Sequence, residues 1–241
     1  MSTVPPPTSP PPPGPPPPPG GFASTPGAMP AQEPYPARLQ IDYPDQLNRV
    51  TTAFRIILII PIMIVLSILT NASTSTFQTE AGAWVVTTGS SILVALSMTT
   101  LLLILFRQRY PKWWFDFALE LNRFSARVCA YFALLTDQYP STVEEQAVHL
   151  EFDYPDNVER DLNRWLPLVK WFLVIPHFII LFFLGIGAFF AVIAAWFAIL
   201  FTGRYPKGLF DYVVGVSRWA LRVYAYAFLL ITDRYPPFAL D

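Results

Sequence analysis

The sequence has few charged residues, a single cysteine and two histidines, and each scarcity excludes a class of function. Only 14% of its 241 residues are charged, against about 25% in a typical soluble domain. The lone Cys129 excludes an internal disulfide and a thiolate-rich metal centre. His149 and His177 are isolated and too few for most zinc chemistry. With a net charge of −1, we expect no metal, no cofactor and no nucleic-acid partner.

Apolar and aromatic residues take the place of charge. Hydrophobic residues make up 53% of the chain and aromatic residues 16%. Such a surplus of rings is typical of a protein that places aromatic side chains at the level of lipid headgroups.

Proline is concentrated at the amino-terminal end, where residues 1–36 hold sixteen of the 26 prolines. Proline has no N–H to donate and a fixed φ, so this stretch is predicted to be a disordered, Pro-rich cytoplasmic tail. It acts either as a solubilising, semi-rigid tail or as a ligand for an aromatic-lined groove on a protein partner. The sequence leaves both interpretations open.

The rest of the chain contains two similar stretches. Ile104–Tyr131 aligns without a gap with Ile199–Tyr226, and half of the aligned positions are identical. We therefore predict repeat 1 at 37–140 and repeat 2 at 141–241. Repeat 1 carries about twenty extra residues near 70–89, which we expect to form an extended loop.

Long apolar runs predict an all-α integral membrane protein with four transmembrane helices in two hairpins. The spans are expected at about 53–70 and 84–106 in repeat 1, and at about 166–184 and 187–203 in repeat 2. Only Gly185-Ile186-Gly187 separates the last two spans, and one long kinked helix is the alternative. The hairpin is preferred because it leaves all sixteen Lys and Arg on one side of the bilayer.

This arrangement predicts a multi-pass cell-membrane protein with both termini in the cytoplasm, because positive residues favour the cytoplasmic side. Both repeats would then have the same orientation, related by a pseudo-two-fold axis along the membrane normal.

Each predicted hairpin is followed by an amphipathic segment, at 112–135 and at 207–231. Their charged residues gather within about 80° of arc on a helix, and the rest is apolar or aromatic. We expect both helices to lie in the plane of the interface. The alternative is a further span, which would place four charges in the bilayer at a cost of roughly 10 kcal/mol or more.

Short stretches upstream of each hairpin alternate apolar and polar residues. They run from Arg38 to Tyr43 and from Val148 to Tyr154, and each ends at a proline. The alternation predicts two strands that pair into a small cytoplasmic ribbon, with unpaired turns as the alternative.

No motif for catalysis is present: there is no Gly-rich phosphate loop, no His-x-x-x-His and no Ser-His-Asp grouping. We therefore predict a non-enzymatic protein without catalytic residues. The candidate contacts to lipid or partner are Arg109, Arg123, Arg127, Arg204, Arg218 and Arg222. The positions that match between the repeats, and for which we expect structural roles, are Asp42, Tyr43, Arg49, Asp116, Asp153, Tyr154, Arg164 and Asp211.

The order of the motifs resembles an uncharacterised bacterial membrane family, catalogued as domain of unknown function 4389. The motifs are Arg-Leu-x-Ile-Asp-Tyr-Pro, Leu-Asn-Arg, Arg-Tyr-Pro-Lys and a closing Thr-Asp-x-Tyr-Pro. The likeness covers about residues 36–238 as two tandem copies. It implies a bacterial cell-membrane protein without an established activity, and it supplies no catalytic residue.

The leading functional hypothesis is a non-enzymatic membrane scaffold or accessory subunit that recruits protein partners through its cytoplasmic face or Pro-rich tail. One alternative is a lipid-binding or lipid-modifying protein. Another is a subunit of a larger transport complex. Membrane lipids are expected partners in all three cases.

Overall fold

The computed structural model describes residues 34–70, 74–78, 84–88, 92–142, 144, 146–155 and 158–241. The predicted Pro-rich tail at 1–36 lies almost wholly outside these residues. Residues Tyr35–Asp241 form one compact unit.

The described elements are mostly helical. The first half contains β1 (Ala37–Ile41), α1 (Arg49–Ala53), α2 (Arg55–Leu58), α3 (Ile60–Thr70), β2 (Thr74–Gln78), β3 (Trp84–Thr88), α4 (Ile92–Leu102), the π-helical turn η1 (Leu103–Arg107) and α5 (Lys112–Phe132). The second half contains β4 (Val148–Phe152), α6 (Val158–Asp161), α7 (Leu166–Leu173), α8 (Ile175–Thr202), α9 (Lys207–Tyr224) and the π-helical turn η2 (Ala225–Leu229).

The predicted ribbon is confirmed. Strands β1 and β4 pair antiparallel along their length, with Leu39 opposite Leu150, its counterpart in the sequence alignment. Alternate side chains of each strand are buried, as expected for a ribbon that packs one face on helices and leaves the other in water.

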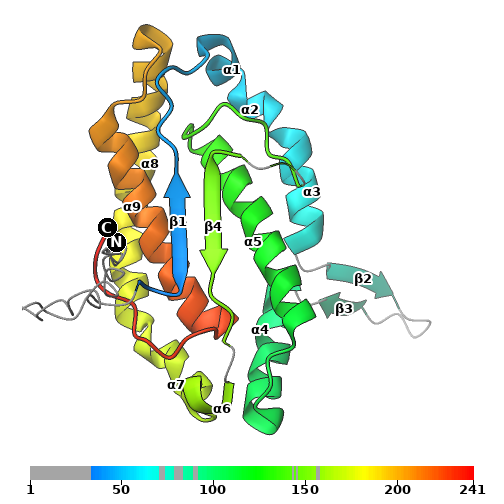
Figure 1. Ribbon diagram of the computed structural model, residues 1–241. Helices are drawn as coiled ribbons and strands as arrows, with labels where there is room; N and C mark the ends of the chain where they lie inside the picture. Colours follow the sequence, from blue (N-terminus) through cyan, green and yellow to red (C-terminus); the bar gives the residue numbers. More distant parts are fainter. Residues whose placement is uncertain are drawn as a thin grey trace, which may run out of the picture. The chain divides into compact units, whose positions relative to one another are not determined.

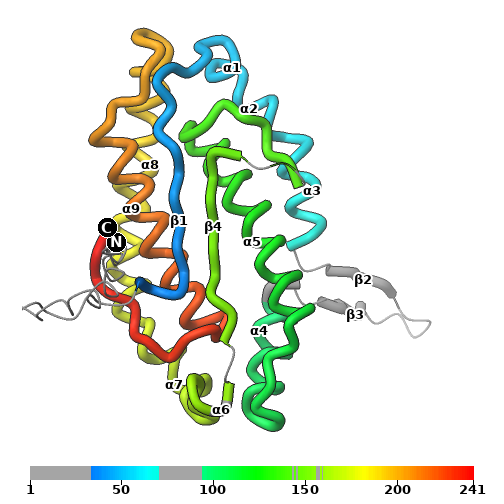
Figure 2. The backbone as a smooth tube through the Cα atoms, in the orientation of Figure 1, coloured from blue at the N-terminus to red at the C-terminus, as the bar shows by residue number. Residues whose placement is uncertain are grey.

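Three layers build the unit (Figure 1). The ribbon lies over α5 and α9, with β4 against α5 and β1 against α9. The third layer, the back layer, consists of α8, which packs on α9, and α3, which packs on α5. Figure 2 shows β1 and β4 running lengthwise between α9 and α5. Strand β1 of repeat 1 packs on α9 of repeat 2, and β4 of repeat 2 packs on α5 of repeat 1.

A pseudo-two-fold axis relates the two repeats, and the pairing of β1 with β4 sets its direction within the molecule. An antiparallel pair centred on Leu39 and Leu150 places the pseudo-two-fold axis across the ribbon, perpendicular to the strands. Helices α5 and α9 accordingly run in opposite directions (Figure 1). The two repeats therefore run antiparallel to each other along the ribbon, and their common orientation relative to a membrane stays a prediction.

The predicted hairpin of spans at 166–184 and 187–203 is wrong. Helix α8 continues through Gly185 and Gly187 for 28 residues. Two glycines in a long apolar helix cost only about 1 kcal/mol each, too little to break it. A Cβ on Gly187 would lie 2.5 Å from the hydroxyl of Tyr212, so this glycine allows close packing of α9 and marks no turn.

The predicted spans of repeat 1 need correction as well. The span at 53–70 is divided into α1, α2 and α3, and the span at 84–106 begins with strand β3, paired with β2. The β-branched run in Trp84–Thr88 favours a strand. Among the described residues, α8 alone is long and apolar enough to cross a bilayer, which is a weak indication of membrane association.

The two amphipathic helices are present, over Lys112–Phe132 and Lys207–Tyr224. Their ends differ because repeat 2 has one extra residue before its closing Thr-Asp. The π-helical turn η2 accommodates this residue. Beyond it, Leu230 has a positive φ of 57°, like the φ of 64° at Leu134 in repeat 1.

Candidate functional site

The loop between η1 and α5 forms the wall of a cleft lined by several basic residues. Gln108 ends the π-helical turn in the left-handed conformation, with a φ of 47°. Pro111 then precedes the first turn of α5 as its N-cap. The chain reverses over a few residues, so Arg107 and Arg109 lie at the end of the molecule beside the start of α5.

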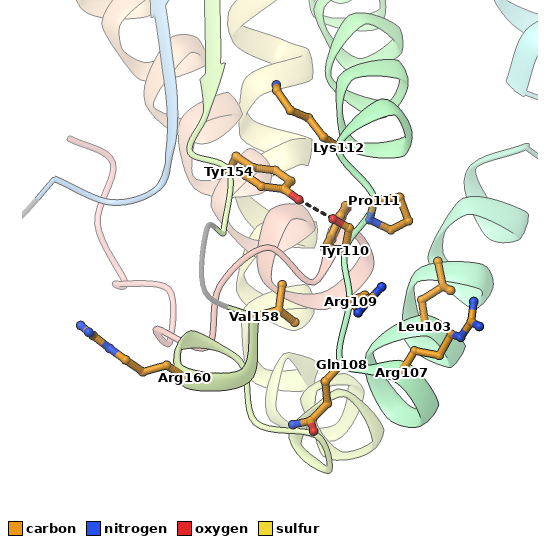
Figure 3. Close-up of a pocket in the computed structure, with 10 residues that line it drawn as sticks. All are labelled: Leu103, Arg107, Gln108, Arg109, Tyr110, Pro111, Lys112, Tyr154, Val158 and Arg160. Atoms are coloured by element: carbon orange, nitrogen blue, oxygen red, sulfur yellow. Dashed lines mark hydrogen bonds between the residues drawn. The ribbon is translucent and has the colours of Figure 1, made fainter.

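Tyr110 and Tyr154 fix this loop. The hydroxyl of Tyr154 donates to the backbone carbonyl of Tyr110 (Figure 3). The ammonium group of Lys112 lies 5.7 Å from the centre of the Tyr154 ring. The Tyr110 ring is buried, and its hydroxyl donates to the carbonyl of Leu229, 3.0 Å away.

The cleft has a volume of about 730 Å³. It is lined by Leu103, Arg107, Gln108, Arg109, Tyr110, Pro111, Lys112, Tyr154, Val158 and Arg160, shown in Figure 3. No carboxylate is among these lining residues. Arg107 and Arg109 have no ion-pair partner among the described residues. Arg160 faces only Asp161, at 3.7 Å, and its side chain is 86% exposed. Among the lining residues that the structure describes, positive charge is therefore in excess.

At the other end of the molecule the same tyrosine contact, here called a tyrosine clamp, is present, but the neighbouring cleft contains carboxylates. Tyr43 donates to the carbonyl of Tyr205, and Lys207 lies 5.4 Å from the centre of the Tyr43 ring. A cleft of about 520 Å³ there includes Asp211 and Asp241 in its lining. Arg107 is replaced by Thr202, and Arg160 belongs to a four-residue insertion found only in repeat 2. The basic cleft is therefore specific to one end.

A buried cation begins the first apolar run of each repeat. Arg55 pairs with Asp137, and Lys170 pairs with Asp233 at 2.8 Å. Both cations also donate to backbone carbonyls, and burial lowers the pKa of Lys170 while Asp233 opposes that shift.

Asp137 and Asp233 also accept hydrogen bonds from the backbone. They accept the backbone N–H of Asn48 and of Asn163, at 2.6 and 2.5 Å. These pairs thus attach the closing Thr-Asp motif of each repeat to the start of its helices.

The predicted contact arginines divide into two groups. The Nε of Arg123 donates to the carbonyl of Leu150 at 3.0 Å, and that of Arg218 donates to the carbonyl of Leu39 at 2.8 Å. These arginines hold the outer edges of the ribbon to the helices.

The other stripe arginines also contact backbone. Arg127 donates to the carbonyl of Ser141, and Arg222 donates to the carbonyl of Asp241. Of the six predicted contact arginines, only Arg109 and Arg204 are exposed with a side chain that has no hydrogen-bond or ion-pair partner among the described residues.

The matched positions are partly brought together. Asp153 pairs with Arg38 at 2.6 Å, Asp42 contacts His149 at 3.2 Å, and Arg164 donates to Gln108 at 3.0 Å. Asp116 and Asp211 form exposed pairs with Lys112 and Lys207, each at 3.0 Å. Arg49 approaches Gly203, the counterpart of Gln108.

His177 is buried. Its Nδ1 accepts from the indole Nε1 of Trp219 at 3.0 Å, and its ring stacks on Phe238 with centroids 4.0 Å apart. The described residues contain no group of three His, Cys, Asp or Glu placed to hold a metal ion.

Alkaline pH should unfold the protein because Tyr110 and Tyr205 are buried. Burial raises the pKa of both hydroxyls well above the ordinary value of about 10. In the unfolded chain they ionise near pH 10, so their contribution is full below that pH and is lost as pH rises above it. Burial also raises the pKa of Tyr35 and Tyr224, which act in the same direction, whereas the lowered pKa of Lys170 acts in the opposite direction. We expect the tyrosinate absorbance of Tyr110 and Tyr205, obtained as the difference from the matching Phe variants, to appear together with the loss of circular dichroism.

Two variants provide the control for this titration. The Tyr205 hydroxyl is buried without a hydrogen-bond partner among the described residues, so Tyr205→Phe should cost little. Tyr110→Phe removes a hydrogen bond and should cost about 1 kcal/mol. Ionisation of Tyr110 or Tyr205 near pH 10, identified by subtracting the titration of the matching Phe variant, in a protein that keeps its circular dichroism would contradict the prediction.

Comparison with known proteins finds one family. A model described as a domain of unknown function (DUF4389) matches residues 165–239. This stretch runs from the start of α7 beyond η2 into the carboxyl-terminal segment. It is similar to that domain, as the sequence motifs predict, and the match covers one of the two predicted copies. No curated protein and no solved structure matches the chain.

Proposed function

We propose that the protein is a non-enzymatic membrane scaffold or accessory protein, which binds the bilayer through its back layer of helices and offers its ribbon face to a protein partner. One observation supports this above all: large apolar side chains are exposed on one layer. Helix α8 alone exposes Phe178, Phe182, Phe183, Phe189, Phe190, Phe197 and Phe201, each by more than 40%. A soluble monomer rarely exposes an apolar patch of this extent.

The ribbon supports the other half of the proposal. Its outward side chains are Arg38, Gln40, His149 and Glu151, and its ends carry Asp42 and Asp153. A polar ribbon opposite an apolar layer gives the molecule one face for lipid and one for water or a partner.

We also infer that residues 37–140 are a second copy of the domain matched at 165–239. The support lies in equivalent contacts at aligned positions. One buried ion pair lies within each copy, Arg55–Asp137 and Lys170–Asp233. The tyrosine hydrogen bonds and the two ribbon arginines join the copies through aligned positions, once in each direction.

Purification of the full chain in mild detergent, followed by native mass spectrometry, tests the function. We expect the chain to stay with membranes through an alkaline carbonate wash and to retain one protein partner at fixed stoichiometry. A chain that is monodisperse in water without detergent would overturn the membrane assignment. Retention of a single lipid species and no protein would overturn the scaffold assignment.

The second candidate function is recognition of an anionic lipid, and the basic cleft favours it. Arg107 and Arg109 are unpaired in the described structure and adjoin Phe106 and Trp113, which are 72% and 69% exposed. Exposed rings beside arginines are typical of the level at which headgroup phosphates lie.

Vesicle binding distinguishes this candidate. At about 1 kcal/mol for each arginine near an anionic surface, Arg107→Ala with Arg109→Ala should weaken binding to phosphatidylglycerol vesicles by about 30-fold. Arg49→Ala with Arg204→Ala removes the same charge at the other end and is the matched control, with a smaller loss expected if the cleft is a specific site. Equal binding of the double variant and this control would exclude a specific site in the cleft.

A further inference from the structure

We propose that the back layer seats the protein in a single leaflet, with α8 parallel to the membrane plane instead of across the bilayer. The proposal rests on the membrane association inferred above and adds the orientation. Its observations are the level of the ribbon along α8 and the positions of the cations.

Hydrogen bonds between elements fix that level. The Tyr212 hydroxyl donates to the carbonyl of Leu184 at 3.0 Å, and Trp219 donates to His177 at 3.0 Å. The segment 212–219 of α9 therefore lies beside the first half of α8. Because Arg218 donates to the carbonyl of Leu39, the centre of the ribbon lies at the same level. The ribbon runs alongside the apolar length of α8, not beyond its end.

A crossing α8 would place the ribbon inside the hydrocarbon. Arg38, Glu151 and Asp153 have side chains that are 39%, 63% and 50% exposed. At mid-bilayer, each charged residue costs about 2.5–3.5 kcal/mol on the insertion scale, and no described element covers this face. With α8 in the membrane plane, the same ribbon lies on the water side.

The positions of the cations at the two ends of the molecule also favour the in-plane orientation of α8. One end has Arg107, Arg109 and Arg164, and the other has Arg49, Arg204 and Lys207. A crossing helix would separate these groups to opposite sides of the membrane, against the positive-inside tendency.

In the in-plane orientation both basic groups lie at the rim of the apolar layer, at the level of anionic headgroups. This charge complementarity identifies one leaflet of a bilayer as the occupant of the apolar face. The 28 residues of α8 would extend for about 42 Å along the surface.

Accessibility of single cysteines tests the orientation. In a Cys129→Ala background, cysteine replaces Arg160 at one end, Arg204 at the other and Gln40 on the ribbon, all exposed positions. A membrane-impermeant maleimide is applied to sealed right-side-out and inverted vesicles. We expect all three sites to react from the same side, at least about tenfold more than from the other.

Depth provides a second readout. Spin labels at Phe182→Cys, Phe190→Cys and Phe201→Cys should report one shallow depth, about 5–10 Å below the headgroups. A crossing helix would instead place position 190 near the bilayer centre and position 201 near the interface. Circular dichroism confirms that each variant is folded.

The outcomes separate this proposal from the proposed function. Labelling of positions 160 and 204 from opposite sides overturns the in-plane orientation and leaves membrane association intact. Release of the chain by carbonate, without vesicle binding, overturns the membrane assignment. A water-soluble dimer that shields position 182 would show that a second copy covers the layer, and would overturn both.

Discussion

Replacement of Asp233 by Ala should destabilise the folded protein by about 3–5 kcal/mol, a large part of the 5–15 kcal/mol typical of a domain. The side chain of Lys170 is fully buried, and Asp233 is its counter-ion at 2.8 Å. Without the carboxylate, the ammonium group keeps only the carbonyl of Thr232, at 2.7 Å, and the ring of Tyr226. The N–H of Asn163 also loses its acceptor. Asp137→Ala should act in the same direction by leaving Arg55 unpaired.

Two variants make this measurement specific. Asp116→Ala removes an exposed carboxylate whose partner, Lys112, is 70% exposed, so it should cost less than about 1 kcal/mol. Adding Lys170→Met to Asp233→Ala removes both charges and should recover much of the lost stability. Thermal unfolding followed by circular dichroism measures all of them. If Asp233→Ala were no less stable than Asp116→Ala, the buried pair would have no structural importance.

Substitution of Phe182 by Asp should reduce binding to vesicles by about 100-fold. Phe182 is 65% exposed on α8, so the fold tolerates the change. Vesicle binding should weaken, because the variant loses about 1.5–3 kcal/mol of apolar burial and brings a charge to the bilayer surface. Flotation of the protein with liposomes measures the partition directly.

The same charge on the other face is the control for this variant. Gln40→Asp changes an exposed ribbon position and should leave vesicle binding within about twofold of the parent. Phe182→Leu keeps an apolar side chain and should bind nearly as well as the parent. Equal flotation of Phe182→Asp and Gln40→Asp would mean that α8 does not contact lipid.

Sequence patterns predicted the local elements with good success. Period-two alternation predicted both strands, and the charged stripe predicted both amphipathic helices, since each pattern reports which side of one element is buried. The matched Arg55 and Lys170, each at the start of an apolar run, gave a signal for the buried pairs. Arg107 and Arg160 gave none, because they have no counterpart in the other repeat.

The predictions that failed concerned longer distances. Gly185 and Gly187 suggested a turn, but Gly187 accommodates Tyr212 on a neighbouring helix. The contact of the stripe arginines with lipid or a partner stays a prediction, but the sequence did not indicate that Arg123 and Arg218 donate to carbonyls of distant strands. Composition and spacing carry no information on which partner a buried donor meets.

By itself, the sequence determined the apolar character, the scarcity of reactive residues, the similarity of its two halves and the faces of its helices and strands. Periodicity and composition are properties of neighbouring residues in the sequence, so they can be recognised without a structure. Only the tertiary structure decided that the repeats run in opposite directions and that α8 is one helix. It also decided that the ribbon lies beside the apolar length of α8. These features depend on hydrogen bonds and close packing between segments far apart in the chain, which no local pattern encodes.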